Sequence, residues 1–151
     1  MATGDGRLHG KAWEQILIAR ARSNGLLLLK NELSAKFIGG GGVKVLKSDL
    51  DFRMFDRSNP ITRVSYFDAK TFDDPYFDYS WLQDNQIQRS VTYGEWGVPS
   101  GFVVWFRPVN EVRFYKGQQI AKSGPGTRFL PEVGVRLGSL HDFDLRAIYA
   151  A

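Results

Sequence analysis

The amino-acid sequence contains no cysteine and only two histidines, His9 and His141. Disulfide bonds and thiolate zinc sites are therefore excluded, and two histidines are too few for a histidine-rich transition-metal site. A metal ion in this protein would be held mainly by oxygen atoms, which favours Mg²⁺, with Mn²⁺ as a substitute.

Long hydrophobic segments are missing as well. The longest apolar runs, residues 26–29 and 102–106, are far too short to span a bilayer. The first six residues show no apolar stretch of the kind found in signal peptides. We therefore expect a cytoplasmic protein that does not bind a membrane.

The composition is that of a globular domain. Of 151 residues, 43% are hydrophobic and 24% are charged, which is ordinary for a soluble protein, and this length can bury a core of its own. Lys and Arg number 20 against 16 Asp and Glu, so the formal net charge is +4, with a pI near 9.4. A positive balance suits a polyanionic partner such as nucleic acid, although many basic domains bind none.

The spacing of apolar residues predicts an α/β domain. Helical spacing indicates helices over 8–23 and 80–93, and alternating or continuous apolar runs indicate strands over 26–29, 49–56, 63–71 and 101–106. The strands 49–56 and 63–71 would pair as a hairpin, and a second hairpin would join 111–115 to 118–122. No clear pattern assigns residues 129–151. This order predicts one domain over 1–151, with a mixed central sheet flanked by helices.

Three charged residues on the first predicted hairpin give the strongest chemical signal. Asp68 and Lys70 are two positions apart in a strand, so both project to the same face, and Asp51 would lie beside Asp68 once the strands pair. Two adjacent carboxylates repel each other, and a divalent cation relieves that repulsion. A metal held in this way can bind a phosphate oxygen and activate water. The alternative is a solvated Asp–Lys pair at an exposed strand end, worth less than ~1 kcal/mol.

Two further acids are candidates for the same site. Glu14, on the inner part of the first predicted helix, could complete the metal shell. Asp49 is close enough in sequence to be the ligand instead of Asp51. Lys70 would place its positive charge beside the attacking water or the phosphorus.

The pair Asp51-Phe52 followed by Asp68-Ala69-Lys70 resembles the signature of the PD-(D/E)xK nuclease superfamily. More narrowly, the chain resembles the Holliday junction resolvases, of both the archaeal and phage type and the RecU type. The motifs occur in that family's order between Gly10 and Phe106. They are Gly10 to Glu14 on a helix, Asp51-Phe52, Asp68 to Thr71, Asn85 to Gln88 on a helix, and an apolar strand from Gly101.

This resemblance implies a restriction-endonuclease-like core with Mg²⁺ held by Glu14, Asp51 and Asp68. Lys70 would serve the nucleophilic water, and Gln86 would assist near the scissile phosphate. The implied reaction is paired phosphodiester hydrolysis in a four-way DNA junction, and symmetric cutting implies a homodimer with twofold symmetry.

The sequence departs from the family pattern in three ways. No proline precedes Asp51, the second acid is Asp68 rather than a glutamate, and no long stalk insertion separates Gly42 from Asp51. The compact form favours a phage source, in which case the protein would act in the host cytoplasm.

Two basic residues near the N-terminus, together with basic residues and glycines around the predicted loop 39–42, are candidates for contacts with DNA phosphates. They are Arg7, Lys11, Lys36, Gly40, Gly41, Lys44 and Lys47. A flexible connector with scattered surface charges explains the same residues equally well. The loop lacks the Gly-Lys-Ser/Thr ending of a nucleotide-binding P-loop.

Aromatic residues and rival functions leave further alternatives open. Tyr76, Phe77, Tyr79 and Trp81 could stack on unpaired bases at a branch point, although packing in the core or in a dimer interface is favoured. The nearest rival function is another nuclease on the same core, of the repair, restriction or flap type. A rival from a different class is a nucleic-acid-binding module without catalysis.

Overall fold

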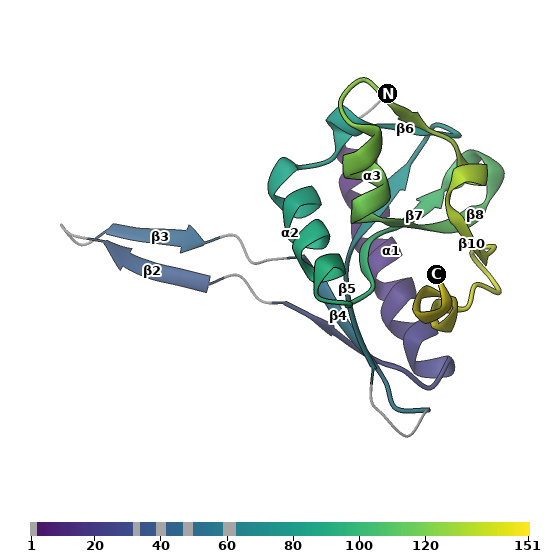
Figure 1. Ribbon diagram of the computed structural model, residues 1–151, viewed down its shortest axis with the longest axis horizontal. Helices are drawn as coiled ribbons and strands as arrows, with labels where there is room; N and C mark the ends of the chain where they lie inside the picture. The colour runs from purple at the N-terminus through teal and green to yellow at the C-terminus, as the bar shows by residue number, and fades with distance from the viewer. Residues whose placement is uncertain (1–2, 32–33, 39–41, 47–49, 59–62) are drawn as a thin grey trace.

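A six-stranded mixed sheet forms the centre of the computed structural model, which describes residues 3–31, 34–38, 42–46, 50–58 and 63–151 (Figure 1). The strands stand in the order β1 (Leu27–Lys30), β4 (Phe52–Asp56), β5 (Arg63–Phe72), β7 (Ser100–Phe106), β8 (Glu111–Lys116) and β10 (Val135–Gly138). Neighbouring strands are antiparallel except β5 and β7, which are parallel. The mixed α/β sheet expected from the sequence is confirmed.

Helix α1 (Thr3–Ser23) covers one face of this sheet. Trp13, Leu17 and Ala21 are fully buried, and their spacing of four residues puts them on one side of the helix. The helix ends where the sequence predicts, because Gly25 adopts a positive φ of 77° and the N–H of Leu26 donates to the carbonyl of Ala21.

Helices α2 (Asp84–Glu95) and α3 (Gly117–Ser123) cover the other face. The central strand β7 is buried on both sides, since Val103 packs toward α1 while Phe102 and Val104 pack toward Ile87 of α2. An apolar run without alternation is what such a strand requires. Helix α2 is the crossover that joins the parallel strands β5 and β7.

Residues 118–122 form a helix, so the predicted second hairpin is wrong. Strand β8 is present, but α3 begins at Gly117 and packs against α2. Gly117 is needed for this close approach rather than for a hairpin turn, because a Cβ there would lie 1.7 Å from Ser90 Oγ. Helix α2 also begins later than expected, since Tyr79–Trp81 form a separate 3-10 turn, η2.

The segment that the sequence leaves unassigned closes the fold. It adds β9 (Arg128–Phe129), which pairs with β6 (Phe77–Asp78), the 3-10 turn η4 (Pro131–Val133), the edge strand β10, and the 3-10 helix η5 (Leu145–Ala150). Phe143, Leu145 and Ile148 are fully buried in the core on the α1 side. The remaining 3-10 turn, η3 (Arg107–Val109), joins β7 to β8.

Strands β2 (Ser34–Ile38) and β3 (Gly42–Leu46) pair with each other outside the main sheet. They stand away from the body of the domain as an arm between β1 and β4 (Figure 1). The sequence predicts a loop over 39–42, whereas Gly42 is the first residue of β3.

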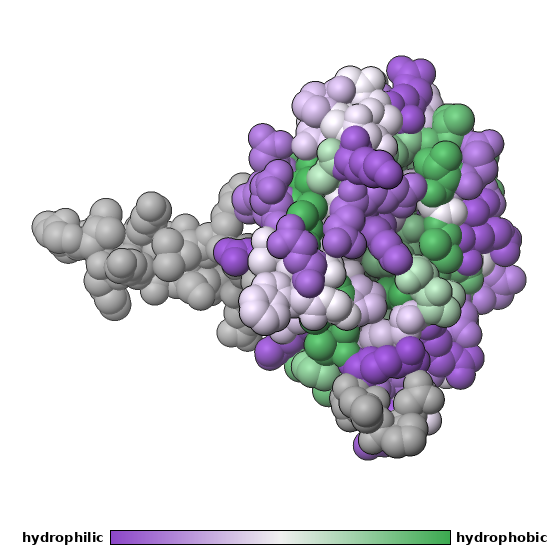
Figure 2. Space-filling model, in the orientation of Figure 1, coloured by the Kyte–Doolittle hydropathy of each residue, from purple (hydrophilic) through white to green (hydrophobic). Residues whose placement is uncertain are grey.

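The surface shown in Figure 2 is mostly hydrophilic over α2 and α3, with apolar side chains in separate patches between them. Among the helices that the structure describes, none combines the length and apolar character that a membrane span requires.

Candidate active site

The β4–β5 pairing brings Asp51 and Asp68 together. Asp51 directly precedes β4, and the register pairs Phe52 with Phe67, so Asp51 lies opposite Asp68. The backbone N–H of Asp51 donates to Asp68 Oδ1 over 3.3 Å. The proximity on which the sequence argument depends is therefore present.

Lys70 lies on the same face of β5 as Asp68. Its Nζ is 2.9 Å from Asp68 Oδ2, and the Asp68 side chain is only 1% exposed against 20% for Lys70. The two atoms form an ion pair without hydrogen-bond geometry, so Asp68 Oδ2 has no hydrogen-bond donor within the described part of the chain. The ammonium group of Lys70 therefore compensates the charge of this buried oxygen by its proximity.

The carboxyl group of Asp51 is held in an environment that disfavours its charge. Burial, then a hydrogen bond with the Asp68 carboxyl and the charges of Asp68 and Glu14, together raise the pKa of Asp51 to about 7. The ammonium group of Lys70 acts in the opposite direction. The pair is thus poised to take up either a proton or a cation near neutral pH.

Glu14 reaches this neighbourhood from α1 but pairs with a different residue. Its Oε1 lies 2.6 Å from Nζ of Lys30, at the end of β1. The hydrogen bond to Glu14 raises the pKa of Lys30, and the charges of Asp51 and Asp68 contribute in the same direction. Lys30 therefore lies close to the carboxylates. Its role cannot be predicted from the sequence, because a lysine that follows four leucines shows no local sign of its distant partner Glu14.

The residues present fit a hard divalent cation in part. Mg²⁺ prefers carboxylate oxygens as ligands, and both Asp51 and Asp68 supply them. Asp68 Oδ2 is buried and lies beside the ammonium group of Lys70. However, the described residues contain no group of three or more acidic or histidine side chains arranged to hold a metal ion. Asp51 and Asp68 form a two-carboxylate site, and Glu14 is paired with Lys30 instead. Asp49 lies outside the described residues.

Gln86 stands in the first turn of α2, the helix that packs over β5 and β7. Its side chain is 7% exposed, and its Oε1 has no hydrogen-bond partner among the described residues. The resemblance to the resolvases implies a role for Gln86 near the scissile phosphate, and that role stays a prediction.

Most of the residues predicted to contact DNA phosphates lie wholly or partly outside the described part of the chain. Lys11 is exposed on α1. The backbones of Lys36 and Lys44 face each other in the β2–β3 arm, but the side chains of both and of Arg7 lie outside the described part, as do Gly40, Gly41 and Lys47 altogether.

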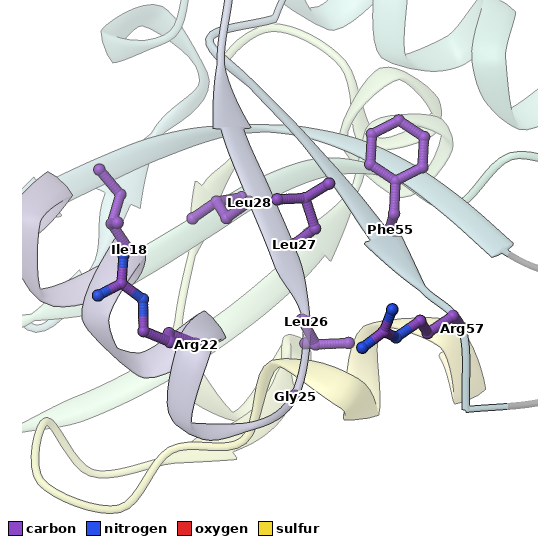
Figure 3. Close-up of a pocket in the computed structure, with 8 residues that line it drawn as sticks. All are labelled: Ile18, Arg22, Gly25, Leu26, Leu27, Leu28, Phe55 and Arg57. Atoms are coloured by element: carbon purple, nitrogen blue, oxygen red, sulfur yellow. The ribbon is translucent and has the colours of Figure 1, made fainter.

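A cleft of 660 Å³ lies at the other end of β1 from Lys30, around Leu26, Leu27 and Leu28 (Figure 3). Arg22 and Arg57 border it, and Ile18, Gly25 and Phe55 complete its lining. None of these lining residues is acidic, so the cleft offers no carboxylate for metal-dependent chemistry.

A mixed sheet with a β-α-β crossover, an antiparallel strand beside it and helices on both faces defines a restriction-endonuclease-like fold. Among solved structures, the chain is similar to Hjc of Archaeoglobus fulgidus, described as a Holliday junction resolvase from an archaeal hyperthermophile. The TM-score is 0.59 at 12% sequence identity, and the match covers 84% of this chain and 95% of that chain. No family model matches the sequence, and no curated protein matches it. The resemblance to Holliday junction resolvases inferred from the sequence is confirmed at the level of the fold.

Proposed function

We propose that the protein is an endonuclease that hydrolyses phosphodiester bonds in branched DNA and resolves four-way junctions. One observation carries the proposal. Strands β4 and β5 bring two carboxylates, those of Asp51 and Asp68, together beside the ammonium group of Lys70. The fold shared with Hjc, a Holliday junction resolvase, supports the choice of substrate.

Asp51 and Asp68 would hold Mg²⁺ or Mn²⁺ in this enzyme. The chemistry supplied by such an ion is polarisation of a phosphate oxygen and activation of water. Asp68 is fixed by its hydrogen bond from the Asp51 backbone and by Lys70, so it needs little reorganisation to act as a ligand. Glu14 remains the candidate third ligand, and it would bind the ion in place of its present partner, Lys30.

Lys70 would act directly on the reacting phosphate. Its ammonium group is partly exposed and held beside Asp68, where it can stabilise the negative charge that develops on the phosphate oxygens. Gln86 would orient the phosphate or the water from α2. The formal net charge of +4 favours association with the DNA backbone.

Symmetric resolution of a four-way junction needs two active sites, so the proposal includes a homodimer with twofold symmetry. Branch shape and phosphate positions would select the substrate more than base edges do. Sedimentation analysis measures the oligomeric state, and a protein that stays monomeric on a junction it cuts would remove the dimer from the proposal.

The test is cleavage of end-labelled four-way junction, flap and linear duplex DNA, with Mg²⁺ and with EDTA. Paired nicks in the junction are expected only with Mg²⁺, and Asp68→Asn should abolish them while junction binding persists. Asp74→Asn, at an exposed aspartate just after β5, is the matched control and should cut like the parent. Equal cutting by Asp68→Asn would refute the assignment, and preferred cutting of flap or duplex DNA would indicate another nuclease type.

A DNA-binding module without catalysis is the second candidate. It is favoured by the engagement of Glu14 with Lys30, which leaves two rather than three acids together in the described part. Calorimetric titration with Mg²⁺ separates the candidates, because the module would bind no ion and would lose nothing in the Asp51→Asn and Asp68→Asn variants.

A further inference from the structure

An aromatic stack begins at Phe72, two positions beyond Lys70 on strand β5. Asp68, Lys70 and Phe72 occupy alternate positions of β5 and therefore share one face. The ring of Phe72 packs against Trp81 with 5.5 Å between centroids. Trp81 in turn lies 5.7 Å from Tyr76 at an interplanar angle of 28°.

The outer end of this stack is fixed by a cation. The guanidinium of Arg128 sits 3.9 Å from the Tyr76 ring centroid, and its Nε lies 3.4 Å from Asp78 Oδ1. Phe72 and Tyr76 thus contact the Trp81 indole from within the protein. A side chain held in this way loses little rotamer freedom when a ligand stacks on it.

Trp81 nevertheless keeps 40% of its surface exposed. By contrast, Phe77 is fully buried in the core. Of these two candidates for base stacking, Phe77 is therefore a core residue and Trp81 is accessible. An exposed indole that is already immobilised offers a flat apolar surface to a ligand.

The charges around Trp81 favour an uncharged ring over a phosphate. Asp73 pairs with Arg107 and Asp78 with Arg128, while Asp74 is exposed close by. With Asp73 and Asp78 both paired to arginines, this surface offers little net positive charge to a phosphate, whereas the face of a nucleobase carries no net charge and stacks on tryptophan regardless of sequence.

The stack lies within reach of a strand bound at the proposed catalytic site. Four residues of β-strand separate Asp68 from Phe72, which spans about 13 Å at ~3.3 Å per residue. One DNA strand rises about 3.4 Å per nucleotide. Trp81 lies a further 5.5 Å from Phe72 between ring centroids, so a base on Trp81 would belong to a nucleotide within about six positions of the cleaved bond.

We propose that Trp81 stacks on an unpaired nucleobase near the cleaved phosphate and so selects DNA with open bases. This inference rests on the proposed nuclease function, because it places the base relative to a phosphate at Asp68 and Lys70. Bases inside a continuous duplex have both faces covered by their neighbours. Trp81 is therefore a specificity-determining residue for branched or single-stranded regions.

The test measures DNA binding in EDTA, by fluorescence anisotropy, for the variants Trp81→Ala and Trp81→Phe. The matched control is Trp96→Ala, since Trp96 is 83% exposed at the other end of α2. Trp81→Ala should weaken binding to single-stranded DNA and to junctions with unpaired bases by roughly 5- to 150-fold. Linear duplex binding should not change, Trp81→Phe should retain most of the affinity, and the control should bind like the parent.

A second readout reports stacking itself. 2-Aminopurine, placed as an unpaired base near the branch point, should lose fluorescence on binding the parent protein and keep it on binding Trp81→Ala. Unchanged affinity and unchanged quenching in Trp81→Ala would overturn the inference, and so would an equal loss for duplex DNA. Conversion of a dimer to a monomer by Trp81→Ala, seen in sedimentation, would assign the stack to a protein interface and equally overturn it.

The two proposals fail in different ways. If the parent protein stacks 2-aminopurine through Trp81 but never nicks DNA with Mg²⁺, the nuclease function is wrong and the stacking platform stands. If nicking depends on Mg²⁺ and Asp68 while Trp81→Ala changes neither binding nor quenching, only the stacking inference is wrong.

Discussion

The variant Asp51→Asn is expected to stabilise the metal-free protein while it abolishes its activity. Burial beside Asp68 raises the pKa of Asp51 from 3.8 to about 7, so the folded state resists ionisation that the unfolded chain permits. Ionisation therefore costs stability increasingly as the pH rises from about 4 to about 7, and the cost is constant above that interval. An asparagine cannot ionise and escapes this cost.

The size of the effect follows from the same shift. At 1.36 kcal/mol per pH unit, a pKa that rises from 3.8 to about 7 corresponds to at most ~4 kcal/mol. Asp51 is only partly buried, and solvent screening reduces this to about 2 kcal/mol. For a domain of this size, Tm should rise by roughly 4–8 °C at pH 8 and much less at pH 4.

The assay is thermal unfolding in EDTA at pH 4 and pH 8, with Asp74→Asn as the control at an exposed aspartate. Repetition in Mg²⁺ adds a second contrast, since an ion at 100 times its Kd stabilises the parent by about 2.7 kcal/mol and should not stabilise Asp51→Asn. A Tm difference that is the same at both pH values, or lower stability of Asp51→Asn at pH 8, would refute the reasoning.

Three further outcomes are expected. Lys30→Ala frees Glu14 from its 2.6 Å partner and should tighten Mg²⁺ binding in calorimetry; unchanged affinity would exclude Glu14 as a ligand. Gly117→Ala should lower the free energy of unfolding in urea by about 1–3 kcal/mol, whereas Gly10→Ala, whose Cβ meets nothing within 4 Å, should not lower it. Asp56→Asn should destabilise at pH 7 by about 1–3 kcal/mol, because hydrogen bonds from the Ser58 side chain and backbone, aided by Arg63, hold the pKa of this buried carboxyl below its usual value. That stability is lost from the parent as the pH falls below about 4, so the difference between the two proteins should shrink there.

The parts of the fold that the sequence predicts well are those with local signals. Trp13 and Leu17 repeat at helical spacing, and Asn24-Gly25 marks the end of α1. The apolar run of β7 has the length of a buried strand and no alternation. The hairpin of β4 and β5 is also local, and for that reason the meeting of Asp51 and Asp68 follows from strand pairing alone.

The parts that the sequence misses depend on distant neighbours. Gly117 is a typical turn residue, yet its role is set by the surface of α2, which lies more than twenty residues earlier. Glu14 stands on the predicted helix and near the predicted site, but the position of β1 gives it Lys30 as its partner. The sequence indicates which residues are chemically unusual, and tertiary packing decides which of them meet.

The hydrogen bond from the Asp51 backbone to Asp68 would make the proposed hydrolysis a direct report on strand register. Side chains along β5 alternate between the two layers of helices, so sliding the strand by a single residue would turn Asp68 and Lys70 toward the core under α1 and aim Phe67 outward. Such a slipped chain would bury two charged side chains in the apolar core, which is costly, and it would have no assembled centre. For variants in the segment that joins β4 to β5, the fraction of molecules able to cut DNA would then report the fraction with the strands in correct register.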